Sequence, residues 1–164
     1  MKELLLQYLT YNAWAHQQLM NFILSLPEEK QKAEISSSFP SLYKTALHMW
    51  GAENIWWQRV TSPANIVPLV NGFTGTMQDI ANGLMEESQQ WLEWVIHTSE
   101  ESLDDILHYK TLAGDSYSQP MQEIVLHVCN HGTYHRGQMI NMIHQLGITG
   151  KLPPTDFCLW ARSR

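Results

Sequence analysis

Four stretches of helical periodicity, separated by segments that contain proline or glycine, constrain the fold of this 164-residue chain more than any other feature. Apolar residues recur at spacings of three and four in the stretches 3–26, 41–61, 76–97 and 120–147. This spacing places them along one stripe of a helix, which has to be buried against neighbouring helices. Four amphipathic helices of this length predict an all-α fold, a four-helix bundle with long crossover connections.

Local signals predict where these helices begin and end. Ser41 is expected to cap the second helix, and Thr76 is expected to cap the third with Asp79 as its capping-box partner. Pro120 can open the fourth helix at its first turn, and Gly147 is suited to end it.

The segments between the helices are less regular. Residues 61–75 are rich in Pro, Gly, Asn and Ser, which predicts a loop. In residues 103–119, β-prone residues flank Gly114 and Asp115, which favours a short hairpin. The tail contains Pro153 and Pro154 and is expected to form a strap over the surface. The length is typical of one domain, so we expect residues 1–164 to form a single domain.

The charge balance excludes some partners. The chain has 16 acidic and 10 basic residues, a formal charge of −6, which argues against nucleic acid or an anionic membrane as partner. Apolar runs stay well below the ~20 residues of a membrane span, and the opening segment lacks the apolar core of a secretory signal. Two cysteines form neither a CxxC pair nor a disulfide framework. We therefore expect a cytoplasmic protein.

Three histidines lie on one face of the fourth helix. His127, His131 and His135 are spaced four residues apart, so each is rotated by about 40° from the one before. Because that face also carries apolar residues, it is expected to turn inward. Two histidines at i and i+4 can bind one metal ion. The alternative is a pair of helix histidines that bond to water, carbonyls or acids. Cys129 should face away from them as a buried, inert thiol.

A third ligand would have to come from another helix. The best candidate is His48, which lies beside the apolar stripe of the second helix, although a hydrogen-bonded core histidine is also expected at such a position. His16 on the first helix is the competitor, with an expected place at the surface or rim. Arg136 is expected to have a packing or salt-bridge role.

Four motifs carry a resemblance that covers the chain from near residue 1 to near residue 160. They are Tyr11–Ala15 (YNAWA), Leu47–Glu53 (LHMWGAE), Leu126–Gln138 (LHVCNHGTYHRGQ) and Pro153–Asp156 (PPTD). With these motifs the chain resembles the DinB/YfiT-like family of metal-binding four-helix bundles. The HxxxHRGQ block is far more specific than HxxxH alone.

The resemblance implies a metal site made of His48, His131 and His135, with nickel or zinc as the divalent ion. It also implies an up-up-down-down bundle that forms a homodimer. His127 falls at a position where the family often has a histidine outside the triad, so it is a candidate for the shell around the ligands, or else a packing residue. Asn12, a buried polar group, and Glu53, an acceptor for an imidazole N–H, are further candidates for that shell.

Three protein ligands leave a position open on the metal for water or substrate. The resemblance implies a metal-dependent enzyme, a thiol S-transferase or a hydrolase, that acts on a small molecule with a low-molecular-weight thiol as a candidate partner. The absence of an acidic general base beside the triad in the sequence favours the transferase. The alternatives are a non-catalytic, stress-related protein that binds a metal or ligand, and a structural dimer in which the histidines are core residues.

Overall fold

A computed structural model describes residues 1–62 and 66–164 of the chain. The long helices are α1 (Lys2–Leu24), α3 (Leu42–Thr61), α4 (Met77–His97) and α6 (Met121–Gln145). The shorter elements are α2 (Glu28–Lys32), α5 (Glu100–Leu103), α7 (Phe157–Arg162) and the strands β1 (Ile106–Lys110) and β2 (Ser116–Pro120). The four predicted helices are therefore confirmed, whereas α2, α5 and α7 were not predicted.

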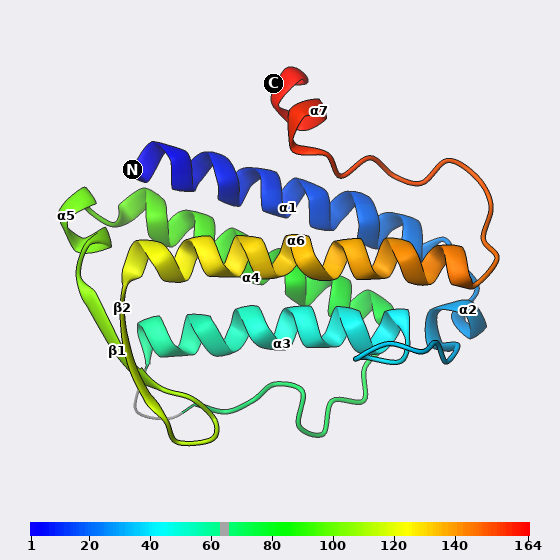
Figure 1. Ribbon diagram of the computed structural model, residues 1–164, viewed down its shortest axis with the longest axis horizontal. Coiled ribbons are helices and arrows are strands. Elements are labelled where there is room, and N and C mark those ends of the chain that lie inside the picture. Colours follow the sequence, from blue (N-terminus) through cyan, green and yellow to red (C-terminus); the bar gives the residue numbers. More distant parts are fainter. Residues whose placement is uncertain (63–65) are drawn as a thin grey trace.

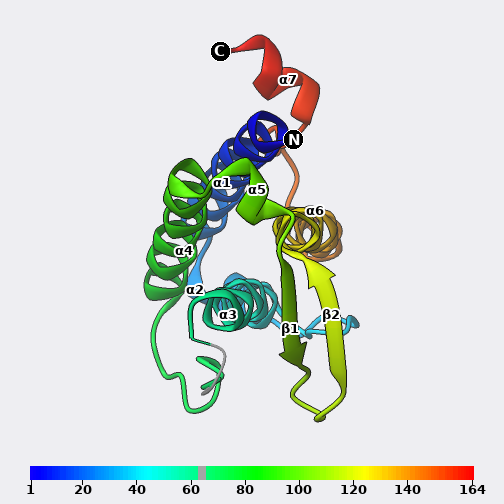
Figure 2. The ribbon, with the colours of Figure 1, turned by 90° about the vertical axis from the view of Figure 1, so that its left-hand side faces the viewer.

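The four long helices lie at the corners of a bundle when it is viewed end-on (Figure 2). Going round the bundle, α1 packs against α4, α4 against α3, α3 against α6, and α6 against α1. The site described below lies along the side where α3 and α6 meet.

The directions of the helices correct the up-up-down-down order that the resemblance implied. Three contacts fix them, joining Lys2 to Thr98, Tyr43 to Gly75 and Thr45 to Met142. The first joins the start of α1 to the end of α4, the second joins the starts of α3 and α4, and the third joins the start of α3 to the end of α6. The order is up-down-down-up, and Figure 1 shows the same directions.

The connections explain this order. The segment between α1 and α3 stays at one end of the bundle, where Ile35 packs in the same cluster as residues from the end of α1 and the start of α3. The chain from residue 66 to residue 76 instead runs along the bundle to the start of α4 (Figure 1). Gln58 holds this crossover against α3, because its side chain exchanges two hydrogen bonds with the backbone of Val67 at 2.8 and 2.9 Å. The predicted loop 61–75 is irregular from residue 66, and residues 63–65 lie outside the described residues.

The predicted caps are confirmed. The Ser41 hydroxyl accepts a hydrogen bond from the backbone N–H of Lys44. Thr76 and Asp79 form the complete capping box. Gly147 follows α6 with φ +70°, a left-handed conformation that glycine adopts without strain.

The core is divided into two main clusters, one toward each end of the bundle. One contains Leu19, Ile23, Met49 and Leu84, and the other contains residues such as Trp91, which is fully buried. Most buried polar residues of α1, α3, α4 and α6 lie at intermediate positions along these helices, and these are Asn12, His16, Glu53, Glu87, Ser88, His135 and Arg136. Thr45 and Arg59 are also buried and lie nearer the two ends of α3. The middle of the bundle is therefore its polar layer.

The predicted hairpin is confirmed, whereas the prediction of a strap describes the tail only in part. The strands β1 and β2 pair antiparallel, with Leu107 opposite Gln119, and lie beside α3 and α6 (Figure 2). The tail is not only a strap, because it ends in the helix α7, whose Trp160 is buried in a cluster with Tyr11 of α1. The carboxylate of Asp156 caps α7 by accepting a hydrogen bond from the backbone N–H of Leu159. Within the described part of the chain, none of the helices has the length and apolar character needed to cross a lipid bilayer.

Candidate metal centre

Three histidines from two helices converge on one point. His48 projects from α3, and His131 and His135 project from successive turns of the antiparallel helix α6. Their Nε2 atoms lie 3.2 Å (His48 to His131), 3.1 Å (His48 to His135) and 3.0 Å (His131 to His135) apart. Among the described residues, these three histidines form the group of His, Cys, Asp or Glu side chains whose ligand atoms lie close enough together to hold one metal ion.

The electrostatics of the group favour neutral imidazoles. Burial, followed by the neighbouring His135, lowers the pKa of His48 to about 4. Burial and the other imidazoles lower the pKa of His131 to about 3. Burial also lowers the pKa of His135, against the opposing effect of its hydrogen bond to Gln138. A neutral imidazole is the form that binds metal ions.

The hydrogen bond at His135 assigns its proton. The Nδ1 atom of His135 lies 2.8 Å from Oε1 of Gln138, and because an amide oxygen only accepts, Nδ1 carries the proton in this arrangement. The Nε2 lone pair is then directed at the other two imidazoles.

The separations of the nitrogens fit a metal ion. Two nitrogens bound at about 2.0–2.1 Å to one tetrahedral zinc ion are about 3.3–3.4 Å apart, close to the separations of 3.0–3.2 Å found here. If all three rings carry their proton on Nδ1, as His135 does, three Nε2 lone pairs face one another without a donor, and a cation between them removes that cost. The donor set therefore fits a divalent ion.

Aromatic residues cover part of the group. Phe39, in the segment before α3, stacks on His48 with ring centroids 3.9 Å apart and an angle of 17° between the planes. The same ring meets His135 edge-on at 5.8 Å. Tyr134 contacts His135 at 5.0 Å but is 62% exposed. Phe39 was not singled out in the sequence, because it lies outside the periodic stretches.

The three candidates for the surrounding shell lie in different places. His127 is exposed, and its ring is 6.0 Å from that of His131 and 5.1 Å from that of Trp56. Asn12 and Glu53 are buried, but among the described residues their hydrogen-bond partners are His16, Ser88 and Arg136, not the three histidines of the group. His127 is thus the candidate that lies next to a histidine of the group.

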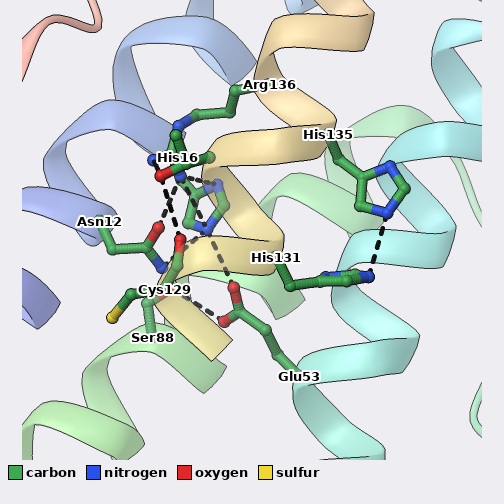
Figure 3. Close-up of polar contacts among 9 residues, drawn as sticks. Asn12, His16, Glu53, Ser88, Cys129, His131, His135 and Arg136 are labelled. Atoms are coloured by element: carbon green, nitrogen blue, oxygen red, sulfur yellow. Dashed lines mark hydrogen bonds and ion pairs between the residues drawn. The ribbon is translucent and has the colours of Figure 1, made fainter. Parts of the chain in front are cut away.

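Asn12 and Glu53 belong to a second, buried network on the opposite side of α6. In Figure 3, His131 and His135 extend from α6 toward α3, whereas Arg136 extends from α6 toward α1. Arg136 donates to Oδ1 of Asn12 at 2.6 Å. His16 lies 2.9 Å from Oε1 of Glu53.

This network corrects the expected place of His16. The histidine is not at the rim but only 1% exposed. Burial lowers its pKa, and the opposing charge of Glu53 counters part of that effect. Arg136 has the expected packing role, since it is 2% exposed and reaches α1. What sequence reasoning missed is that Arg136 and His16 share one network, because a spacing along one helix does not show the partner on another.

Cys129 is a buried thiol, as predicted, with 1% of its surface exposed. Burial raises the pKa of this thiol well above its ordinary value. A thiol in this state is not a nucleophile near neutral pH. His144, on the same helix, is exposed and stands outside the group.

A cleft opens beside His48. It has a volume of about 520 Å³, within the range of small-molecule sites. Its walls come from α3, from the crossover and from the hairpin turn, and the residues that line it are His48, Gly51, Ala52, Ile55, Pro68, Val70, Asn71 and Leu112. Apart from His48 and Asn71 the walls are apolar or small, so the cleft can bring an apolar molecule to the histidine group.

Comparisons with known proteins agree with the fold and the motifs. A sequence model of the DinB family matches residues 1–163. The chain is 27% identical over 158 residues to protein DinB of Bacillus subtilis (strain 168), covering 92% of this chain and 89% of that protein.

Two solved structures have a similar fold. A DinB-like protein from Bacillus cereus ATCC 10987 superposes with a TM-score of 0.72 at 21% identity, covering 92% of this chain and 94% of that one. A protein assigned to the DinB family from Exiguobacterium sibiricum 255-15 gives a TM-score of 0.66 at 19% identity, covering 92% and 95%.

Proposed function

The chain belongs to the DinB family, and on this premise we propose that it is a metal-dependent enzyme that transfers a low-molecular-weight thiol to a small electrophilic molecule. His48, His131 and His135 would hold the divalent ion, nickel or zinc. The observation that carries the proposal is the convergence of three Nε2 atoms within 3.2 Å of one another, with His48 also lining a cleft.

The donor set determines the chemistry. Three neutral imidazoles leave the charge of a divalent ion uncompensated, and such an ion lowers the pKa of a bound thiol or water. The remaining contributions come from the chain itself. Oε1 of Gln138 accepts a hydrogen bond from the Nδ1–H of His135 and so keeps the Nε2 lone pair available. Phe39 stacks on His48 and shields that side of the group from water.

The proposed step is a substitution. The thiol loses its proton to solvent, and its sulfur donates an electron pair to the electrophilic carbon. A carbon–sulfur bond forms while the bond from that carbon to the leaving group breaks, and the leaving group departs with its electron pair. The apolar walls of the cleft hold the electrophile and exclude water that would compete.

The arrangement of carboxylates supports the transferase over the hydrolase. Among the described residues, no carboxylate is hydrogen-bonded to the three histidines, and Glu53 is engaged with His16 at 2.9 Å. Hydrolysis by an activated water commonly uses such a group as a general base. A thiol with a lowered pKa reacts as the anion and does not need one.

Metal analysis of untagged protein tests the site. We expect about one nickel or zinc ion per chain in the wild type and loss of that ion in His48→Ala and His131→Ala variants. The matched control is His144→Ala, which removes an exposed histidine from the same helix α6. Metal retained in both ligand variants, or no stoichiometric metal in the wild type, would reject the proposed site.

Activity assays on the metal-loaded protein test the reaction. The wild type should consume 1-chloro-2,4-dinitrobenzene in a cysteine-dependent reaction that His48→Ala lacks. Hydrolysis of 4-nitrophenyl acetate without a thiol dependence would favour the hydrolase instead. Stoichiometric metal without turnover in either assay would favour the non-catalytic alternative.

A further inference from the structure

A second cleft lies along the same face of α3, beyond the one at His48. It has a volume of about 480 Å³. Its lining comes mainly from the hairpin, and the residues are Arg59, Ile66, His108, Tyr109, Lys110, Thr111, Leu112, Ser116, Tyr117 and Ser118. Leu112 lines both clefts, so the two adjoin at the hairpin turn. The function proposed above does not use the second cleft.

Arg59 is the unusual residue of this cleft. It is only 8% exposed, yet within the described ranges its guanidinium takes part in no ion pair, and its buried Nε atom has no hydrogen-bond partner. Burial lowers the pKa of Arg59, but an arginine side chain stays charged near neutral pH. A buried charge without a partner is costly.

Aromatic rings hold the guanidinium in place. Its central carbon lies 4.3 Å from the ring centroid of Trp56 and 5.1 Å from that of Tyr109. These cation–π contacts offset part of the burial cost, but they do not satisfy N–H donors. The terminal Nη donors, which are not among the fully buried atoms and bond to no described residue, match an oxyanion, which can accept two parallel hydrogen bonds from an arginine.

The charges of the lining have one sign. Lys110 adds a second cation and the cleft contains His108, whereas no Asp or Glu is among its described lining residues. This is notable in a chain whose acidic residues outnumber its basic residues by 16 to 10.

We propose that the second cleft is an anion-binding site in which Arg59 takes the oxyanion, a carboxylate or a phosphate, of a small organic molecule. The rings of Tyr109 and Tyr117 line the same cleft and provide apolar contact for the part of the molecule next to the anion.

The position of Arg59 relative to His48 suggests the shape of the substrate, an inference that rests on the function proposed above. Arg59 is 11 residues after His48, so it lies about three turns or 16 Å along α3, rotated by only about 20°. A substrate that occupied both clefts would be elongated, with its reactive centre near His48 and its oxyanion at Arg59.

Binding measurements with a charged and a neutral probe of the same shape test the anion site. By NMR titration at constant ionic strength, phenylacetate should bind the wild type more tightly than phenylacetamide. An Arg59→Met variant should bind phenylacetate roughly tenfold or more weakly. The matched control is Lys44→Met, which removes an exposed cation from the same helix outside both clefts. Inorganic phosphate serves as a third probe and distinguishes a phosphate site from a carboxylate site.

Stability measurements separate this role from a structural one. If Arg59 is kept for binding, Arg59→Met should melt at the same temperature as the wild type or higher, because it removes an unpaired buried charge. Phenylacetate should raise the melting temperature of the wild type but not of the variant. A variant that is strongly destabilised without ligand would indicate a structural role and overturn the proposal.

The His48→Ala variant keeps the two proposals independent. It should retain phenylacetate binding, since His48 is about three helical turns from Arg59. If the wild type binds no metal but discriminates phenylacetate from phenylacetamide through Arg59, the proposed function fails and the anion site stands. If phenylacetate and phenylacetamide bind equally, or Arg59→Met binds phenylacetate like the wild type, the anion site is rejected whatever the metal content.

Discussion

Two alanine substitutions in α6 test how closely this helix packs against α1 in the polar layer. Gly132 and Gly137 both lie in the interior of α6. A Cβ atom at Gly132 would lie 2.8 Å from Oδ1 of Asn12 and 3.0 Å from both Nη1 of Arg136 and Cε1 of His16. A Cβ atom at Gly137 would have no described atom within 4 Å outside its own helical backbone and chain neighbours. The pair therefore separates packing from helix propensity.

The two effects have opposite signs. Replacing a helical glycine by alanine stabilises by up to about 1 kcal/mol when nothing obstructs the methyl group, whereas overpacking a filled site costs about 1–3 kcal/mol. The groups around Gly132 cannot move freely, since Asn12 is held by Arg136 at 2.6 Å. We expect Gly137→Ala to raise the free energy of unfolding by up to about 1 kcal/mol and Gly132→Ala to lower it by about 1–2 kcal/mol.

Urea unfolding of metal-free protein, followed by circular dichroism, measures both changes against the wild type. In thermal unfolding the same changes correspond to roughly 2–4 °C per kcal/mol for a chain of this size. If Gly132→Ala were as stable as Gly137→Ala, α6 could not lie as close to α1 as the distances indicate.

Three further predictions concern a buried carboxyl group, the two cysteines and a helix cap. Burial raises the pKa of Glu87 to about 7 from an ordinary value of 4.5, so the folded state disfavours the carboxylate. The free energy of unfolding should therefore fall as the pH rises from about 4.5 to about 7. Glu87→Gln should match the wild type near pH 4.5 and exceed it by up to about 3 kcal/mol at pH 8 in urea unfolding, and a pH-independent difference would contradict this cause. In native protein a thiol reagent should label the exposed Cys158 rapidly and the buried Cys129 only after unfolding. Thr76→Ala should cost about 1 kcal/mol by loss of the cap, with no change in metal content.

The helices and their ends could be predicted because their signals are local. The periodic stripe of the third predicted helix, for example, contains Ile80, Leu84 and Trp91, and all three are fully buried in α4. The caps at Ser41 and Thr76 act within three residues, so the sequence carries both partners. The helix α7 was missed because its apolar residues follow two prolines and are too few to show a period.

The direction of the helices depended on the connections rather than on the helices themselves. An amphipathic stripe is the same whether a helix runs up or down, so periodicity does not fix the order. The order implied by the resemblance was wrong, and contacts such as Tyr43 to Gly75 show that α3 and α4 run parallel. A crossover along the bundle joins them (Figure 1).

The candidate site, too, could be predicted only in part from the sequence. The spacing of His131 and His135 along one helix predicted that their side chains could reach a common point, and their Nε2 atoms lie 3.0 Å apart. His48 and His16 were both candidates for a third position on the evidence of the residues alone. The packing of α3 against α6 brings His48 to the pair, while His16 faces Glu53 in the other network.

The sequence by itself determined the four helices, most of their caps and the one helix face that carries the paired histidines, because each depends on residues a few positions apart. Only the tertiary structure decided which helices are neighbours, which third histidine completes the group, and that Arg59 is buried beside Trp56 and Tyr109 without an acidic partner among the described residues. The physical reason is that these contacts join residues far apart in the chain, and their geometry follows from how the helices and the hairpin pack together.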